Sequence, residues 1–264
     1  MSRSAWGTAL IGMQYRILKA FFPLAPDCAR GRLYEGKSKL EVLCGRNLGR
    51  FSGKFIIDFG CGNGVEAIEI ARLGAKRIIG IDNRETVLQE ARRRARIAGV
   101  EEICHFMSST NELADMIVSI DAFEHFQNPA GVLNVMEAIL KPEGEVVASF
   151  GPTWYHPLGG HLFSVFPWAH LFFSEPALLQ WRSGFKEDGA TRFSEVEGGL
   201  NQMSIARFRK LIEESPFQFA SFELVPIKRL SFAHIRWTRE FTTAIVRCRL
   251  VKRSASASLA NGWS

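Results

Sequence analysis

The sequence lacks any apolar run long enough to cross a membrane. A spanning helix needs about 18 apolar residues or more, and the apolar N-terminal stretch 5–26 is interrupted by Arg16 and Lys19. The same stretch has no clear small-residue cleavage site, so we expect no secretory signal. We expect an amphipathic leading helix instead, either as a lid over a ligand or, alternatively, as an element that lies on a membrane surface.

Cysteine is scarce, and the charge is modest. The five cysteines are odd in number and form no Cys-x-x-Cys pair, which argues against a disulfide scaffold or structural zinc and for a reducing, cytoplasmic compartment. The net charge is +6. The arginine run at 92–96 has no interleaved aromatic residues for base stacking, so we favour a solvated helix face and expect no nucleic-acid partner.

What the sequence does have is an alternation of strand and helix patterns from about residue 55 to 150. Such alternation predicts a parallel sheet with helices packed on it. We expect Pro142 and Gly144 to close the last of these helices and turn the chain into the next strand. The expected strands are 55–60, 77–82, 102–107, 116–121 and 145–150, then 217–227 and 242–251. The expected helices are 64–74, 84–98, 130–140 and 204–215.

The first expected strand contains Asp58 and runs into a turn with Gly60, Gly62 and Gly64. Alternate glycines let the backbone turn tightly and approach a ligand, while the next helix points its free N–H groups at the turn. A carboxylate here would repel a pyrophosphate but attract a cationic amino group. The second strand ends in Asp82, where a carboxylate can accept hydrogen bonds from ribose hydroxyls. These two acids favour S-adenosylmethionine over NAD.

At these residues the chain resembles the class I S-adenosylmethionine-dependent methyltransferases of small-molecule type, and it is similar to the quinone-biosynthesis O-methyltransferases. The segments that carry the resemblance are 58–64, 80–82, 115–126, 140–146 and 241–246. The resemblance implies an α/β fold: a Rossmann-like, seven-stranded, mostly parallel sheet with helices on both faces, an antiparallel last strand and a substrate-cap insertion after the fifth strand. It also implies S-adenosylmethionine as the cofactor, bound by Asp58, Gly60, Cys61, Gly62, Asp82, Asn83 and Asp121.

The sequence departs from that family after the third expected strand. The acid that the family places against the adenine amino group is absent there, and Ser108 or Ser109 stands in the region instead. Cys61 lies inside the glycine turn, and we interpret it as a small residue in a crowded position rather than as a nucleophile.

The chain divides into five expected parts. They are an N-terminal helical lid (1–50), a cofactor-binding core (51–150), a substrate-cap insertion (151–200), the C-terminal part of the core (201–253) and a disordered tail (254–264). The insertion leaves the carboxyl end of the fifth strand, the edge at which open α/β sheets bind ligands. It is rich in aromatic residues and histidines, and its expected substrate contacts are Trp154, Tyr155, His156 and His161.

His125 follows the fourth expected strand and is our candidate for the base that deprotonates an acceptor hydroxyl. An alternative makes Asp121, Glu124 and His125, with His156 or His161, the ligands of a divalent cation. That arrangement resembles the small-RNA 2′-O-methyltransferases and some quinone O-methyltransferases. We assign no metal, and we predict O-methylation of a small molecule.

Two further alternatives stay open from the sequence. One is a lipid or quinone acceptor reached by peripheral contact with a membrane, and the other is a non-catalytic cofactor-binding partner subunit. The acceptor itself and the oligomeric state are left open, because a fold constrains the cofactor far better than the substrate.

Overall fold

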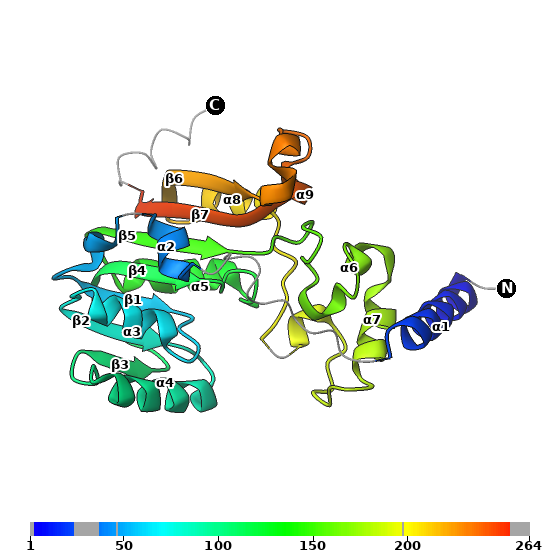
Figure 1. Cartoon of the computed structure of the whole chain (residues 1–264), viewed down its shortest axis with the longest axis horizontal. Helices are drawn as coiled ribbons and strands as arrows, with labels where there is room; N and C mark the ends of the chain where they lie inside the picture. The colour runs from blue at the N-terminus through cyan, green and yellow to red at the C-terminus, as the bar shows by residue number, and fades with distance from the viewer. Residues whose placement is uncertain (1–2, 24–36, 46, 197, 254–264) are drawn as a thin grey trace.

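A seven-stranded sheet organises the protein (Figure 1). The computed structural model describes residues 3–23, 37–45, 47–196 and 198–253. The strand order is β3-β2-β1-β4-β5-β7-β6, with parallel pairing from β3 to β5 and antiparallel pairing of β7 with both of its neighbours. The strands are β1 (Phe55–Phe59), β2 (Arg77–Ile81), β3 (Cys104–Met107), β4 (Ala114–Ile120), β5 (Leu140–Phe150), β6 (Phe217–Pro226) and β7 (Thr243–Lys252). The predicted α/β architecture is confirmed.

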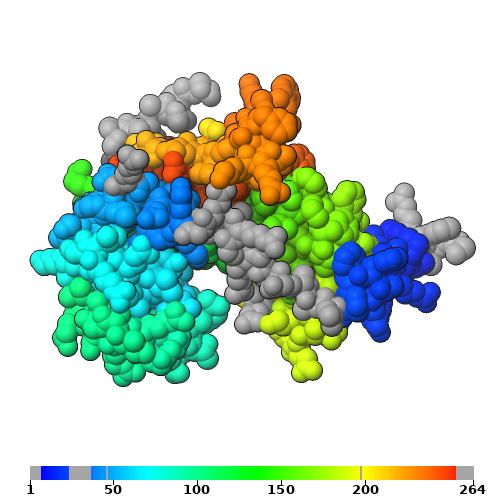
Figure 2. Space-filling view, in the orientation of Figure 1, coloured from blue at the N-terminus to red at the C-terminus, as the bar shows by residue number. Residues whose placement is uncertain are grey.

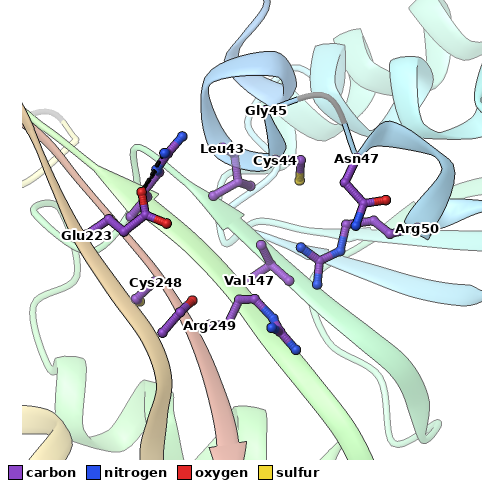
Figure 3. Close-up of a pocket in the computed structure, with 11 residues that line it drawn as sticks. Leu43, Cys44, Gly45, Asn47, Arg50, Val147, Glu223, Cys248 and Arg249 are labelled. Atoms are coloured by element: carbon purple, nitrogen blue, oxygen red, sulfur yellow. Dashed lines mark hydrogen bonds and ion pairs between the residues drawn. The ribbon is translucent and has the colours of Figure 1, made fainter.

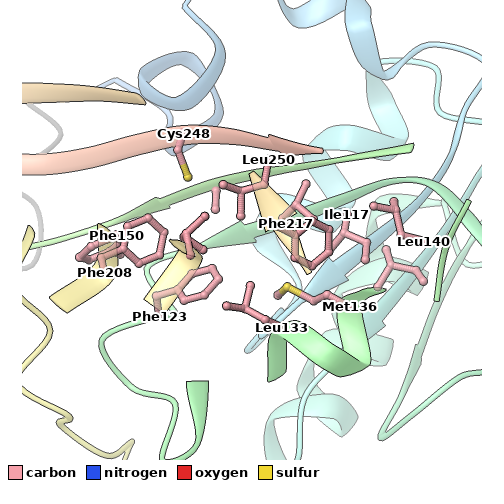
Figure 4. Packing of buried hydrophobic residues seen from close by; sticks show 14 of the residues in the cluster. Ile117, Phe123, Leu133, Met136, Leu140, Phe150, Phe208, Phe217, Cys248 and Leu250 are labelled. Atoms are coloured by element: carbon pink, nitrogen blue, oxygen red, sulfur yellow. The ribbon is translucent and has the colours of Figure 1, made fainter. Parts of the chain in front are cut away.

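Each face of the sheet packs against its own set of helices. Neighbouring residues of β1 point to opposite faces, so Ile56 belongs to one apolar cluster and Ile57 to the other. The cluster around Ile56 includes α2 (Lys39–Cys44), α3 (Val65–Arg72) and α4 (Glu85–Ala98). The cluster around Ile57 includes α5 (Pro129–Ala138) and α8 (Ile205–Glu213), as Figure 4 shows. In that second cluster the Phe208 ring centroid lies 5.2 Å from that of Phe123.

The segment between β5 and α8 forms a separate small body beside the sheet (Figures 1 and 2). Its helices are η2 (His161–Phe163), α6 (Ala169–Phe172), α7 (Glu175–Arg182) and η3 (Phe193–Glu195). The N-terminal helix α1 (Arg3–Phe21) packs against α7, with Leu18 buried in the cluster that also holds Phe163 and Trp181. The Trp181 indole donates a 2.7 Å hydrogen bond to the carbonyl of Phe22.

Helix α1 therefore extends the apolar core of the insertion instead of lying over the glycine turn, and its role as a lid stays a prediction. Residues 24–36, which belong to the predicted lid, and the predicted disordered tail 254–264 lie outside the described residues. No helix in the described part of the chain is both long and apolar enough to cross a membrane.

The predicted boundary between α5 and β5 is wrong. Helix α5 ends at Ala138, and Leu140 already pairs with Ala114 of β4. The register then shifts before Met116 pairs with Glu145, so the residues between bulge out of the ladder. Pro142 tolerates this position because a bulge does not demand its missing N–H group. A proline and a glycine therefore mark a bulge here, not the end of a helix.

Strand β3 also starts later than predicted, at Cys104 instead of residue 102. The amide of Ile103 donates a 3.2 Å hydrogen bond to the carbonyl of Val100, which keeps the preceding residues in a turn after α4. The remaining elements are η1 (Leu48–Phe51) before β1, and η4 (Lys228–Ala233) and α9 (Arg239–Thr242) between β6 and β7.

Candidate functional site

The glycine turn between β1 and α3 cannot carry side chains at two of its positions. Gly60, Gly62 and Gly64 have φ angles of +83°, +51° and +77°, a region that side-chain-bearing residues rarely adopt. A Cβ on Gly60 would lie 2.8 Å from the Cβ of Ala122, and one on Gly64 would lie 2.7 Å from the ring of Phe106. The turn therefore packs its backbone directly against the loop after β4 and against β3.

Asp58, inside β1, is a buried acid with an unused acceptor. Its side chain is 2% exposed, and its Oδ2 has no hydrogen-bond partner in the described protein. Burial, reinforced by the negative charge of Glu66, raises the pKa of Asp58 to about 8. An ammonium group brought close would stabilise the ionised form. The residue therefore fits a cofactor that carries an amino group.

Asp82, just past the end of β2, connects the second strand to the glycine turn. Its Oδ2 accepts a 3.1 Å hydrogen bond from the amide of Gly62, and its Oδ1 accepts from the backbone N–H and the Nε of Arg84 at 3.0 and 3.1 Å. Asn83 follows it and is exposed to solvent. The carboxylate is thus held at the turn, in the position where it was expected to meet ribose hydroxyls.

Asp121 directly follows β4 with a φ of +50°, and its amide donates to the carbonyl of Ser149 on β5. Its Oδ2 lies 2.9 Å from the Nζ of Lys39, which also lies 3.5 Å from Glu66. Burial alone would lower the pKa of Lys39, but the two acids raise it above its ordinary value. Lys39 starts α2, whose N-terminus is capped by Ser38.

The sequence analysis missed Lys39, because no ligand-binding motif surrounds it and it lies 19 positions before Asp58 in the chain. With Lys39 the site offers a buried carboxylate and an ammonium together. These are the partners that the two charges of an amino-acid group require.

His125 lies in the loop after β4 and is oriented by the turn that precedes α8. Its Nδ1 is 2.8 Å from the carbonyl oxygen of Gly199. A carbonyl can only accept a hydrogen bond, so Nδ1 carries a proton, and in the neutral form of the ring Nε2 is the basic nitrogen. A Cβ on Gly199 would lie 2.6 Å from the carbonyl oxygen of His125, so this approach requires glycine.

Asn201 holds the same loop by three hydrogen bonds. Its side-chain amide donates to the carbonyls of Phe123 and Phe126 at 2.6 and 2.8 Å, and its backbone amide donates to the carbonyl of Glu124 at 2.9 Å. Gly199 and Asn201 were also missed from the sequence. Only the Gly-Gly pair at 198–199 could have indicated a tight turn there.

Glu124, His125 and His161 form a cluster whose candidate ligand atoms all lie within 4.8 Å of one another. Glu124 is 1% exposed; its Oε1 accepts from the amide of Gly151 at 3.3 Å, and its Oε2 has no hydrogen-bond partner in the described protein. Burial raises the pKa of Glu124 well above its ordinary value. One carboxylate oxygen and two imidazoles are suitable ligands for a divalent cation.

The cluster differs from the predicted metal set in one way, because Asp121 is not part of it and pairs with Lys39 instead. Of the two histidines considered as the further ligand, His161 lies in the cluster, and its ring centroid is 5.1 Å from that of His125.

The other predicted substrate contacts lie in the insertion with structural partners. His156 is 4% exposed, its Nδ1 accepts from the amide of Leu158 at 2.9 Å, and burial lowers its pKa to about 4. Trp154 packs edge-on against His170, and the ring of Tyr155 lies 5.5 Å from that of Phe241. Their roles toward a substrate stay predictions.

Cys61 is buried in the glycine turn, and burial raises the pKa of its thiol. The thiol therefore remains protonated at neutral pH and is a poor nucleophile.

A cavity of about 170 Å³ lies away from this site, between the end of α2 and strands β6 and β7 (Figure 3). Arg50, Arg247 and Arg249 line it, and each of them pairs with Glu145 or Glu223. These are structural ion pairs within the sheet and between η1 and the sheet, and Arg247 also donates a 2.8 Å hydrogen bond to the carbonyl of Val42 in α2.

The sheet order with an antiparallel β7, together with acids at the ends of the strands around a glycine turn, defines the class I methyltransferase fold. Residues 50–152 match the family described as "Methyltransferase domain". The ubiquinone biosynthesis O-methyltransferase of Nitrosococcus oceani is 38% identical over 118 residues, which are 42% of this chain and 48% of that protein. The corresponding enzyme of Neisseria meningitidis is 33% identical over 104 residues, 37% of this chain and 44% of that protein.

The chain thus spans about half the length of the curated relatives it matches. Among solved structures, an S-adenosylmethionine-dependent methyltransferase from Mesorhizobium loti superposes with a TM-score of 0.53 at 16% identity, over 83% of this chain and 100% of that one. An O-methyltransferase from a polyketide multienzyme of Brevibacillus brevis, in complex with S-adenosyl-L-homocysteine, gives 0.52 at 16% identity, over 91% and 79%. At these identities the structures support the fold. Residues 50–152 are therefore similar to class I S-adenosylmethionine-dependent methyltransferase domains.

We expect Asp82→Ala to weaken binding of S-adenosylmethionine by about 1–3 kcal/mol, because it removes a charge-assisted hydrogen-bond acceptor. Isothermal titration calorimetry measures the effect. Glu143→Ala, which removes an exposed acid in the bulge of β5, is the control and should leave the affinity unchanged. An unchanged affinity for Asp82→Ala would remove the residue from the cofactor site.

We expect binding of S-adenosylmethionine to tighten as the pH rises toward about 8. Below that pH the free site holds Asp58 protonated, and a cationic amino group must displace the proton. The affinity should therefore fall by up to about tenfold for each pH unit below the pKa. Asp58→Asn has no such proton, so the slope of affinity against pH should flatten in that variant. The same slope in both proteins would contradict the assignment.

Proposed function

We propose that the protein transfers the methyl group of S-adenosylmethionine to a hydroxyl of a small-molecule acceptor, with His125 as the base. The observation that carries the proposal is the hydrogen bond between Nδ1 of His125 and the carbonyl of Gly199. This hydrogen bond leaves Nε2 as the basic nitrogen of the neutral ring. His125 lies at the edge of the sheet where β1, which leads into the glycine turn, and β4, which leads into Asp121, both end.

In this proposal each residue around the turn has a defined task. Asp58 and Lys39 bind the charged ends of the cofactor's amino-acid group, and Asp82 accepts hydrogen bonds from its ribose. When bound, the cofactor supplies a methyl group on a positively charged sulfur, which is already a good leaving group. The protein then mainly has to position the two reactants.

His125 handles the proton. Its Nε2 accepts the hydroxyl proton of the acceptor as the oxygen becomes bonded to the methyl carbon. The imidazolium that forms lies beside Glu124, whose Oε2 has no hydrogen-bond partner among the described residues, so an ionised carboxylate there would stabilise the positive charge.

The relatives support a hydroxyl as the acceptor. The curated proteins from Nitrosococcus oceani and Neisseria meningitidis are named O-methyltransferases of ubiquinone biosynthesis. The similarity covers less than half of this chain, in and around the cofactor-binding part. The acceptor of this protein is therefore inferred as a chemical class only.

A second candidate is metal-assisted transfer at the same place. The proximity of Glu124, His125 and His161 and the unpartnered Oε2 of Glu124 favour it. In that mechanism Glu124, His125 and His161 would hold a divalent cation, with Nε2 of His125 as a ligand, and the cation would supply the positive charge that favours loss of the acceptor's hydroxyl proton. His125 cannot serve as the base while its lone pair binds a metal, so the two candidates exclude each other.

We expect His125→Ala to lower turnover by about 10²–10⁴-fold while leaving the affinity for S-adenosylmethionine nearly unchanged, because a general base contributes to the reaction and not to cofactor binding. Transfer of labelled methyl to a panel of phenols and catechols measures turnover, and calorimetry measures affinity. His105→Ala, on β3, is the control histidine. Full turnover in His125→Ala would refute the base role, and no turnover of the unmodified protein with any acceptor would favour a non-catalytic partner subunit.

Removal of divalent cations separates the two candidates. If His125 is the base, we expect methyl transfer to be unaffected by a chelator. If the cluster binds a metal, transfer should stop and recover on addition of Mg²⁺ or Zn²⁺, and the unmodified protein should bind the metal in calorimetry while Glu124→Gln does not. Either result decides between the mechanisms without identifying the natural acceptor.

A further inference from the structure

The connection between β6 and β7 stands out from the body of the protein. We call residues 227–242 the projection; it contains η4 and α9 and rises above the edge of the sheet (Figures 1 and 2). Its large apolar side chains point into solvent: Phe232 is 84% exposed, Trp237 86% and Ile235 57%. Three large apolar side chains that are more than half exposed within six residues are unusual on a protein surface and indicate a contact surface.

The projection has a backbone conformation that is held by its own hydrogen bonds. The amide of Ile227 donates to the carbonyl of Thr242 at 2.8 Å, which closes its base. The ring of His234 bonds the Thr242 hydroxyl at 2.9 Å, and the Thr238 hydroxyl donates to the carbonyl of Ala233. The exposed side chains are therefore presented on a backbone with its own hydrogen bonds.

The charge of the projection is mainly positive. It carries four basic residues, Lys228, Arg229, Arg236 and Arg239, and a single acid, Glu240. The Glu240 carboxylate accepts hydrogen bonds from the first amides of α8 at 3.1 and 2.8 Å, so it caps that helix. Arg229 and Arg236 are exposed beside the apolar side chains, so the solvent-facing surface is cationic and apolar.

The projection lies at the same edge of the sheet as the candidate site. Antiparallel pairing places Pro226 and Thr243 at the end of β5 that carries Phe150, beside the carboxyl end of β4. Its Phe241 ring lies 5.5 Å from Tyr155, which belongs to the insertion. A surface that binds the projection therefore lies at the same edge of the sheet as the loop that carries His125.

We propose that the projection docks the protein on an anionic lipid bilayer. Tryptophan and phenylalanine side chains partition into the interfacial region of a bilayer, and arginine and lysine beside them bind anionic headgroups. The projection is convex, and its apolar side chains include the aliphatic Ile235. A single-stranded nucleic acid would need a groove lined with stacking rings instead. The inference goes beyond the proposed function and does not depend on it.

Helix α1 carries a second exposed apolar stripe, made of Leu10, Met13, Ile17 and Phe21. It is a separate surface, because the opposite side of the helix packs on α7. The contribution of this stripe to membrane binding has to be measured separately from that of the projection.

Co-sedimentation with lipid vesicles tests the proposal. We expect the protein to bind phosphatidylcholine vesicles that contain roughly one-third phosphatidylglycerol, and to bind pure phosphatidylcholine at least tenfold more weakly. The double variant Phe232→Ser/Trp237→Ser should lose about tenfold or more in vesicle affinity. Arg236→Gln should lose about fivefold, and added salt should weaken binding of the unmodified protein.

The control variants remove apolar side chains and a positive charge of the same kinds from other parts of the surface. Ile97→Ser/Val135→Ser takes two exposed apolar side chains from α4 and α5, and Arg96→Gln takes one charge from α4; both should bind vesicles like the unmodified protein. Affinity for S-adenosylmethionine should be the same in all variants, which would show that each remains folded. Vesicle binding is measured without methyl transfer, so a failure of the proposed function would not change its result.

Three outcomes would overturn the proposal. The first is no vesicle binding, or equal loss in the control variants. The second is that Leu10→Ser/Ile17→Ser abolishes binding while Phe232→Ser/Trp237→Ser has no effect, which would place the contact on α1. The third is that the projection variant instead abolishes self-association in sedimentation equilibrium, or binding of a fluorescent single-stranded RNA, with vesicle binding intact.

Discussion

Burial of carboxylates at the carboxyl ends of β1 and β4 is the constraint on which the rest of the site depends. Asp58 and Glu124 lie almost wholly out of water, and each has an oxygen without a hydrogen-bond partner in the described protein. Such groups cost stability unless they are protonated or meet a cation. Burial raises the pKa of both residues. The edge of the sheet is therefore prepared for positively charged partners, and the fold tolerates the cost because large apolar clusters cover both faces.

The supporting structure around these acids is consistent with that constraint. Lys39 brings a positive charge to Asp121 and Glu66, and the amide of Gly151 donates to Glu124. Neither group is close in sequence to the acid that it supports. The loop after β4 is fixed from the other side by the turn that contains Gly199 and Asn201. The site is thus assembled from the N-terminal segment, the core and the end of the insertion.

The sequence was sufficient to predict elements whose pattern is formed by neighbouring residues in the chain. The positions of β1, β2 and the glycine turn follow from a buried apolar run, a terminal acid and glycines at fixed spacing, and all three lie where they were predicted. The sequence was insufficient to predict residues that reach the site from a distant part of the chain. Lys39 and Asn201 have ordinary neighbours in the chain, and only the sheet brings them to the site. The start of β5 was misplaced because Pro142 has the same local signature in a bulge as after a helix.

The bonds from Gly199 and Asn201 to the loop of His125 have a consequence for how this protein could change its substrate. These two residues terminate the segment that is expected to recognise the acceptor, and they also set the orientation of the imidazole. An insertion of different length or sequence would move its own last turn and rotate the ring with it. Divergence of the recognition segment is therefore restricted to its interior, and a chimaera that keeps activity has to retain residues 198–202 from the parent that supplies β4.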